Sequence, residues 1–178
     1  MNEWIDVSPI LADLVIIRRG AYILHPEGLD EVGTDITNVV FISDCGNDLK
    51  ELNLKEYKKL RSINIGHGCF KNVNVFSIDG FTELKSILIG NGSFTNFKNG
   101  NENDTSRSFH VSNCAELGWI EIGPNSFLEC GGGFELVNLP KLESIKVGGI
   151  ELYIHNFRYC PFVIESIMND TLLMNRSS

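Results

Sequence analysis

The sequence has little of what several classes of protein require. Its longest apolar runs, at residues 14–17 and 39–42, are far shorter than the roughly 20 residues of a membrane-spanning helix, so no transmembrane segment is predicted. Its 15 Lys and Arg residues are scattered, and acidic residues outnumber them to leave a net charge of −8. No basic patch is therefore expected, which excludes nucleic acid and anionic membranes as partners.

Signals for secretion and for metal binding are also scarce. Glu3 and Asp6 stand where a secretory signal carries basic residues, and no apolar stretch with a small-residue cleavage site follows. The five cysteines are odd in number and widely separated, which fits reduced thiols better than a disulfide framework. The four histidines lack the paired spacing of zinc ligands. These absences predict a cytoplasmic protein without a metal or another cofactor.

What the sequence does have is a recurring spacing of apolar residues, Φ-x-x-Φ-x-Φ, as in LKSILI at residues 84–89. One series of these triplets begins at residues 36, 60, 84, 117 and 142, and a second begins at residues 49, 73, 106, 131 and 149. The two series alternate in steps of about 13 and 11 residues, which sum to a repeat of about 24. Each repeat is predicted to be one coil with two short parallel strands.

The segments that follow the strands repeat as well. The first series leads into glycine-containing turns that end in phenylalanine: GHGCF at 66–70, GNGSF at 90–94 and GPNSF at 123–127. We expect Phe70, Phe94 and Phe127 to stack in register inside the coils. The second series leads into one apolar residue per coil: Tyr57, Phe81, Cys114, Leu139 and Phe157. Because Gly, Pro or Asn interrupts every intervening stretch, helices are not expected there.

The repeats divide the chain into three predicted parts. Residues 1–35 carry no clear repeat and are expected to form an N-terminal cap, with two strands or a short helix around a turn at residues 18–20. Residues 36–165 form a solenoid of about five coils, interrupted by a polar insertion at residues 97–107 that is predicted to be a surface loop. Residues 166–178 form a C-terminal tail.

The triplets LxxIxIG, followed by xxSF and then FxIxxxxxLxxIxIG, resemble the leucine-rich repeats of large protist families. They are more distantly similar to bacterial surface repeats of about 23 residues with two strands per coil. The resemblance is strongest at residues 108–127 and 134–148. It implies a right-handed solenoid that recognises proteins through exposed strand positions and has no catalytic residues. The asparagine column typical of such repeats is missing, and its place is taken by Asp44, Gly68, Gly92, Asn125 and Ile150.

Several residues suggest a metal, thiol or phosphate site, but the sequence around each also allows a purely structural role. His67 and Cys69 suggest part of a metal site, but the next coil has Asn91 and Ser93 there, so Cys69 is predicted to fill a slot for a small side chain. Cys114 and Cys160 are similarly interpreted as core residues. The glycine run at 130–133 precedes a strand and lacks the Lys and Ser/Thr of a phosphate loop, so it is predicted to be a turn or bulge. Each row of outward strand positions holds a single acid, and the protein is predicted not to be an enzyme.

One row of outward positions, together with neighbouring residues, is predicted to form a binding patch. Leu88, Glu121 and Lys146 belong to the row, and Trp119 and Lys85 lie beside it. An aromatic, an aliphatic and three charged residues are a composition typical of protein interfaces. Trp119 replaces Asn or Ser of the other coils, so its ring is expected to point outward, with folding over a turn as the alternative. The predicted function is a protein–protein interaction scaffold that is a monomer or self-associates weakly through its end coils. A structural repeat fragment and a carbohydrate-active β-helix remain as alternative functions.

Overall fold

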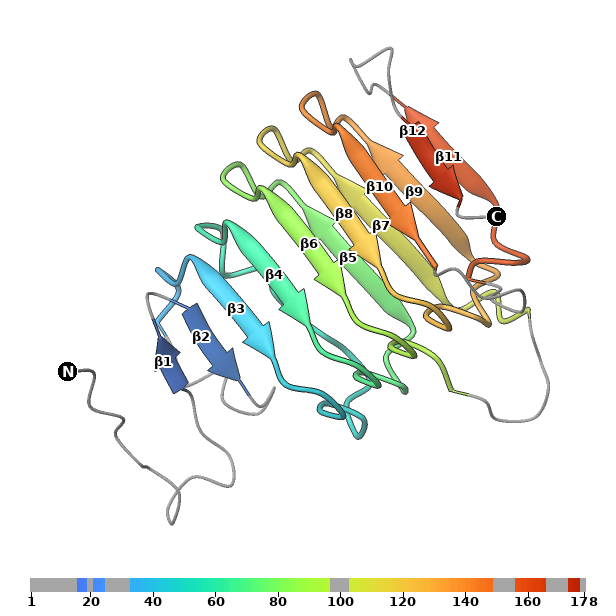
Figure 1. Cartoon of the computed structure of the whole chain (residues 1–178), viewed down its shortest axis with the longest axis horizontal. Helices are drawn as coiled ribbons and strands as arrows, with labels where there is room; N and C mark the ends of the chain where they lie inside the picture. Colours follow the sequence, from blue (N-terminus) through green and yellow to red (C-terminus); the bar gives the residue numbers. More distant parts are fainter. Residues whose placement is uncertain are drawn as a thin grey trace.

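The computed structural model describes residues 16–18, 21–24, 33–96, 103–148, 156–165 and 173–176. Over these residues the chain is a β-solenoid of about 5 turns without helices, and its strands lie in two facing sheets (Figure 1). The predicted fold class, with two short parallel strands per coil, is therefore confirmed. No helix in the described part is long and apolar enough to cross a membrane.

Sheet A has the order β1 (Ile16–Arg18), β2 (Ala21–Leu24), β3 (Asn38–Phe41), β4 (Ser62–Ile65), β6 (Ser86–Ile89), β8 (Trp119–Ile122), β10 (Ser144–Val147) and β12 (Leu173–Arg176). Sheet B has the order β11 (Phe162–Glu165), β9 (Gly133–Val137), β7 (Ser108–Ser112) and β5 (Val75–Asp79). From β4 onward, successive strands alternate between the two sheets, whereas β1 to β4 all lie in one sheet. All neighbouring strands are parallel except β1 and β2, which form an antiparallel pair.

Strand register places equivalent residues of successive coils side by side. In sheet A, Ile63 pairs with Ile87, which pairs with Ile120 and then Ile145. All four are buried. Because strand side chains alternate between faces, one inward isoleucine per coil produces a continuous apolar column. The apolar triplets in the sequence therefore identify the residues of each strand that point inward.

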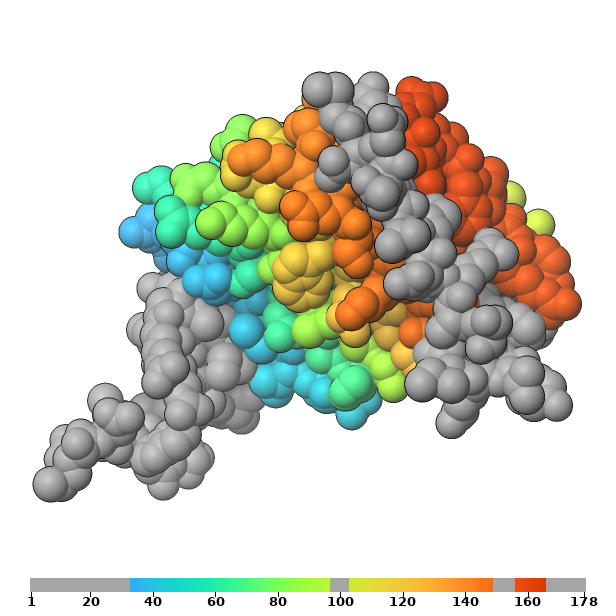
Figure 2. All heavy atoms as spheres, turned by 45° about the horizontal axis from the view of Figure 1, so that its top comes forward, coloured from blue at the N-terminus to red at the C-terminus, as the bar shows by residue number. Residues whose placement is uncertain are grey.

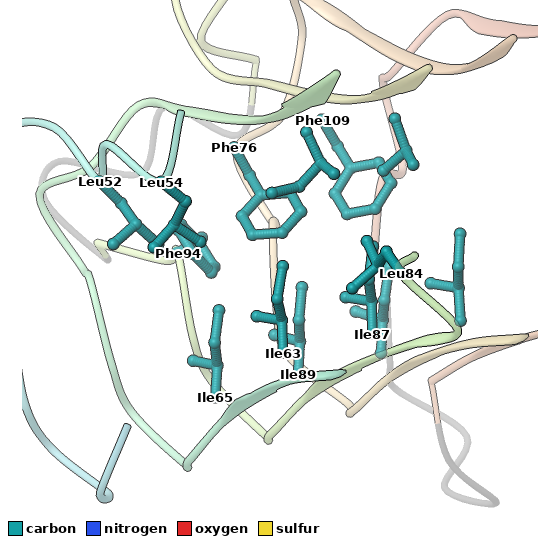
Figure 3. Packing of buried hydrophobic residues seen from close by; sticks show 14 of the residues in the cluster. Leu52, Leu54, Ile63, Ile65, Phe76, Leu84, Ile87, Ile89, Phe94 and Phe109 are labelled. Carbon is teal, nitrogen blue, oxygen red and sulfur yellow. The ribbon is translucent and has the colours of Figure 1, made fainter. Parts of the chain in front are cut away.

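Phenylalanine rings fill the space between the sheets. Phe70, Phe94 and Phe127 are stacked as predicted, with ring centroids 5.4 Å and 4.8 Å apart. A second column comes from sheet B, where Phe109 stacks on Phe76 at 5.1 Å and on Phe134 at 4.9 Å. Figure 3 shows Phe76 and Phe109 opposite isoleucines of the other sheet. The rings thus connect each coil to its neighbours as well as one sheet to the other.

The stacked turns share a backbone conformation rather than a side chain. At the positions where leucine-rich repeats typically carry asparagine, the described residues all have positive φ: 62° at Asp44, 65° at Gly68, 66° at Gly92 and 60° at Asn125. Ile150, the fifth of these positions, lies outside the described residues. Two residues later, Phe70, Phe94 and Phe127 also have a left-handed backbone conformation, with φ between 54° and 55°. This conformation costs a bulky residue about 1–2 kcal/mol, which burial of its ring offsets.

An asparagine ladder is present instead at the ends of the sheet B strands. Asn138 Nδ2 donates to Asn113 Oδ1 at 2.8 Å, and Asn113 Nδ2 donates to Asp79 Oδ1 at 2.7 Å. Both asparagines have positive φ, 54° and 55°, which Asn adopts more readily than most residues. The ladder therefore supports the same turn in successive coils.

A column of small hydrogen-bonding side chains explains the position of Cys69. Ser93 Oγ accepts the Cys69 backbone N–H at 3.1 Å and donates to the Gly66 carbonyl at 2.8 Å. Ser126 repeats this arrangement one coil later, accepting from Ser93 N–H and donating to the Gly90 carbonyl. Cys69 Sγ likewise lies 3.0 Å from the Ile42 carbonyl, so its predicted role as a small side chain in this slot agrees with the geometry.

One predicted strand differs from the structure, and a second cannot be compared. The triplet at residues 49–54 buries Leu52 and Leu54 but forms no strand, and Asn53 Oδ1 accepts the Lys55 backbone N–H at 3.1 Å. That local bond favours a turn over an extended edge strand. The triplet at residues 149–154, with the predicted outward Tyr153, lies outside the described residues. The strand that follows β9 in sheet B is β11, and Val163 pairs with Glu135.

The segment predicted as a C-terminal tail contains strand β12, which pairs in parallel with β10. At the other end, β2 pairs in parallel with β3, so part of the predicted cap extends sheet A. Of the two predictions for this region, the structure has the two strands, β1 and β2, and not the short helix. Residues 19 and 20 of the predicted turn lie outside the described part.

The predicted surface loop at residues 97–107 ends in a buried cation. Residues 97–102 lie outside the described part, but Arg107 is buried. Its guanidinium donates to the carbonyls of Phe94 and Lys71, both at 3.1 Å, and its Nε lies 3.5 Å from Asp104 Oδ2. The surface assignment is therefore wrong for Arg107, because its side chain provides hydrogen bonds to two earlier coils.

Replacing Phe94 with Ala should destabilise the whole solenoid. The substitution removes a ring stacked between Phe70 and Phe127, and large-to-small changes of this type cost about 3–5 kcal/mol. Urea unfolding followed by circular dichroism measures the loss. Val75→Ala is the matched control, because Val75 is 44% exposed and its truncation should cost less than about 0.5 kcal/mol. Similar losses for the two variants would contradict the stacked core.

Replacing Glu129 with Gln should stabilise the protein in a pH-dependent way. Burial raises the pKa of Glu129 above its ordinary value of 4.5, while its Oε2 accepts the Asn96 N–H at 3.1 Å. A raised folded-state pKa means that stability decreases as pH rises through the unfolded and folded values. Gln keeps an acceptor without the charge, so the melting temperature of Glu129→Gln should exceed that of the wild type at pH 8. The difference should disappear near pH 4, and a gain independent of pH would contradict this origin.

Candidate functional site

The outward side chains of sheet A form two parallel rows. One row consists of Val40, Asn64, Leu88, Glu121 and Lys146, and the strand register pairs each with the next as predicted. The adjacent row consists of Asn38, Ser62, Ser86, Trp119 and Ser144. Trp119 and Glu121 are two residues apart on β8, so their side chains point to the same face. The rows therefore bring Trp119 beside Glu121 and Lys146.

Trp119 lies on the surface of this sheet. The residue is 42% exposed, which agrees with the predicted outward direction. Ser86, its neighbour on β6, is buried although it belongs to the outward row, as expected beside a large indole. Figure 2 shows the bands of β6, β8 and β10 adjacent on one exposed face.

A depression of about 550 Å³ adjoins Trp119. It lies over β8 and β10 and over the turns that precede them, and it is lined by Glu116, Gly118, Trp119, Ile120, Glu121, Lys141, Glu143, Ser144 and Lys146. Three of the five predicted site residues therefore line one hollow: Trp119, Glu121 and Lys146. Lys85 and Leu88 lie on or next to β6, outside the lining, and border the face on that side.

The hollow coincides with a missing side chain. Backbone hydrogen bonds place Lys85, Gly118 and Glu143 in one column, since Gly118 N donates to Lys85 O at 2.9 Å and Glu143 N donates to Gly118 O at 2.8 Å. Only the middle member has no side chain. A Cβ at Gly118 would lie 3.8 Å and 3.9 Å from its nearest carbonyl oxygens, an ordinary contact distance. The glycine therefore leaves open space next to Trp119 without being required by the backbone.

Charges of both signs surround the depression. Lys141 Nζ donates to Glu116 at 2.6 Å and 2.7 Å, whereas Lys146 Nζ lies 3.8 Å from Glu121 Oε2. Glu143 is exposed and has no salt bridge among the described residues. Because the pairs are solvated, each contributes at most about 1 kcal/mol to stability, and their side chains are available for exchange with a ligand.

Sequence reasoning missed the turn residues of the lining. Glu116 and Lys141 occupy the same position of successive repeats, one residue before the leading leucine of each triplet. Comparing that position across coils would have identified the ion pair, because residues in one column lie one strand spacing apart. Gly118 could have been found in the same way, as a gap in a column that contains Arg61 and Lys85.

The outward face of sheet B carries a close pair of polar side chains. His110 Nδ1 lies 2.9 Å from Glu135 Oε2, and both residues belong to the row that begins at Ser77. His67, considered for a metal site, accepts the Asn91 backbone N–H through Nδ1 at 2.9 Å. No group of three or more potential metal ligands occurs within the described residues. The remaining histidines, at positions 25 and 155, lie outside that part.

The cysteines differ from the expectation of five reduced thiols. Cys130 and Cys160 form a disulfide, with Cα atoms 5.3 Å apart, within the usual range for such bonds. Their wide separation in sequence obscured this pairing, because stacking of coils brings distant residues together. Cys45, Cys69 and Cys114 are free and buried. Gly131 and Gly132 next to the disulfide approach the backbone of residues 104–107, so this glycine run packs closely as a turn segment.

No protein-family model, curated protein or solved structure matches this chain.

The free thiols should resist alkylation in the folded protein. Cys45, Cys69 and Cys114 are buried, and burial raises the pKa of Cys114 to about 11. The Cys45 thiol donates to Cys69 Sγ at 3.6 Å, which raises the pKa of Cys45 and lowers that of Cys69. Because a thiol must reach the reagent before its thiolate can react, iodoacetamide at pH 8 should label all three slowly, Cys69 included. Peptide mass spectrometry measures the labelling, with guanidinium-unfolded protein as the control in which all three thiols react rapidly. Rapid labelling of any of them in the folded protein would contradict its burial.

Proposed function

We propose that this chain is a non-enzymatic recognition module, related in type to leucine-rich repeats, that binds a protein partner across β6, β8 and β10. The observation that carries the proposal is the position of Trp119, an exposed indole on a rigid parallel sheet beside a hollow of about 550 Å³. Exposed tryptophans next to pockets are typical anchors of protein interfaces. The binding residues are those selected from the sequence: Lys85, Leu88, Trp119, Glu121 and Lys146.

The arrangement suits a protein ligand because it combines an apolar centre with a charged border. Trp119 and Leu88 supply apolar area that a partner side chain can cover. Lys85, Glu121 and Lys146 surround them with both signs of charge, which fix orientation and reject partners of the wrong pattern. Parallel strands hold these groups on a stiff backbone, so little conformational entropy is lost on binding.

Replacing Trp119 with Ala should weaken partner binding while leaving the fold intact. Truncating a central aromatic anchor costs about 2 kcal/mol or more, roughly a 30-fold loss of affinity. Leu88→Ala should reduce affinity less, because Leu88 lies outside the hollow. Surface plasmon resonance against a partner isolated from the native organism measures both changes, and thermal melting verifies the fold.

Two further variants complete this test: one fills the hollow, and the other changes a residue on the opposite sheet. Gly118→Leu places a side chain in the hollow without a backbone clash and should also weaken binding. Val75→Ala, on the other sheet, should bind as well as the wild type. A partner that binds all four variants equally would contradict recognition through this face.

A further inference from the structure

Strand β11 is the edge of sheet B. It pairs in parallel with β9, and its other side has no neighbouring strand in the described part of the chain. All four of its residues, from Phe162 to Glu165, are exposed. An edge strand of this kind presents unpaired N–H and C=O groups that can pair with another chain.

The inward positions of β11 are exposed as well. Phe162 pairs with Phe134 and Ile164 with Leu136, both of which are fully buried. Phe162 is nevertheless 45% exposed and Ile164 37% exposed. These two side chains therefore occupy the end of the core column, where a further strand would cover them. Val163 on the outward face is 36% exposed, so the strand is apolar on both faces.

Native edge strands are usually protected by lysine, proline or a covering segment. β11 carries none of these between residues 162 and 164, and its one charge is Glu165 at the end. The opposite side of sheet B differs, because residues 49–54 follow β5 in the stack and bury Leu52 and Leu54 without forming a strand. Within the described residues, β11 thus has no complementary edge to meet in a head-to-tail contact.

We infer that β11 pairs with β11 of a second copy of this chain, antiparallel and about a two-fold axis through Val163. Opposite residues in an antiparallel pair share a face, so centring the register on Val163 keeps the inward sides together. Phe162 of each copy then lies opposite Ile164 of the other, a favourable aromatic and β-branched pair. The two solenoids join end to end, and the interface closes because it is self-complementary.

The charge of the chain opposes this contact and makes it dependent on salt. Each copy carries a net charge of −8, so the two repel one another at long range. Glu165 lies opposite Pro161 of the second copy in this register, which keeps the two carboxylates away from the axis. The carbonyls of Pro161 and Glu165 already accept N–H groups of Phe134 and Asn138, so neither residue extends the pairing. The dimer is consequently weak, and it tightens as the Debye length falls from about 14 Å to about 4 Å between roughly 0.05 and 0.5 M salt.

Sedimentation equilibrium of the wild-type chain tests the self-association. The weight-average mass should rise from 19.9 kDa toward twice that value as concentration increases, and it should rise further in high salt. Val163→Lys places two like charges on the axis and should weaken dimerisation at least tenfold. Val75→Lys is the matched control, because it adds the same charge at an exposed valine on the opposite edge of sheet B and should leave dimerisation unchanged.

Charge complementation tests the axis itself. Val163→Lys and Val163→Glu should each be monomeric alone, whereas an equimolar mixture should form a heterodimer detectable by native mass spectrometry. Melting temperatures close to the wild-type value verify that each variant is folded. The inference is overturned if the wild type stays monomeric at all concentrations, if Val163→Lys dimerises normally, or if the mixture does not associate. Loss of dimerisation leaves partner binding at Trp119 intact, since the two surfaces lie on different sheets.

Discussion

The structure depends on one constraint, that equivalent residues of successive coils must lie one strand spacing apart in register. Parallel hydrogen bonding satisfies the backbone only if each strand meets its neighbour without slipping, and the apolar columns enforce this because a one-residue shift would turn buried isoleucines outward. The stacked rings of Phe70, Phe94 and Phe127 act in the same direction across the turns. Their left-handed backbone is retained because the buried rings outweigh its cost.

The same constraint determines what the surface can do. Register brings outward side chains of different coils into rows, so a site on this protein is a two-dimensional pattern assembled from several repeats. The hollow beside Trp119 arises because one coil has a glycine where its neighbours have Lys85 and Glu143. Function of this kind requires departures from the repeat, whereas stability requires adherence to it. The insertion illustrates the compromise, since Arg107 binds carbonyls of two coils where the spacing lengthens.

A solenoid buries each coil against its neighbours, so each end coil has a neighbour on one side only. At the N-terminal side of sheet A the strand direction reverses beyond β2, because β1 pairs with β2 antiparallel while β2 is parallel to β3. At the other end β11 has one strand neighbour and exposes side chains at core positions. The proposed recognition through the face and the inferred association through the end therefore use separate surfaces of one architecture.

The sequence by itself determined the period, the two strands per coil, the stacked phenylalanines and the outward direction of Trp119, because the repeat spacing encodes neighbours in register. Only the tertiary structure decided the Cys130–Cys160 disulfide, the burial of Arg107 and the open edge at β11. These features arise where the repeat is interrupted or ends. There, the neighbours of a residue depend on how the chain closes in space, and the distance along the sequence no longer predicts them.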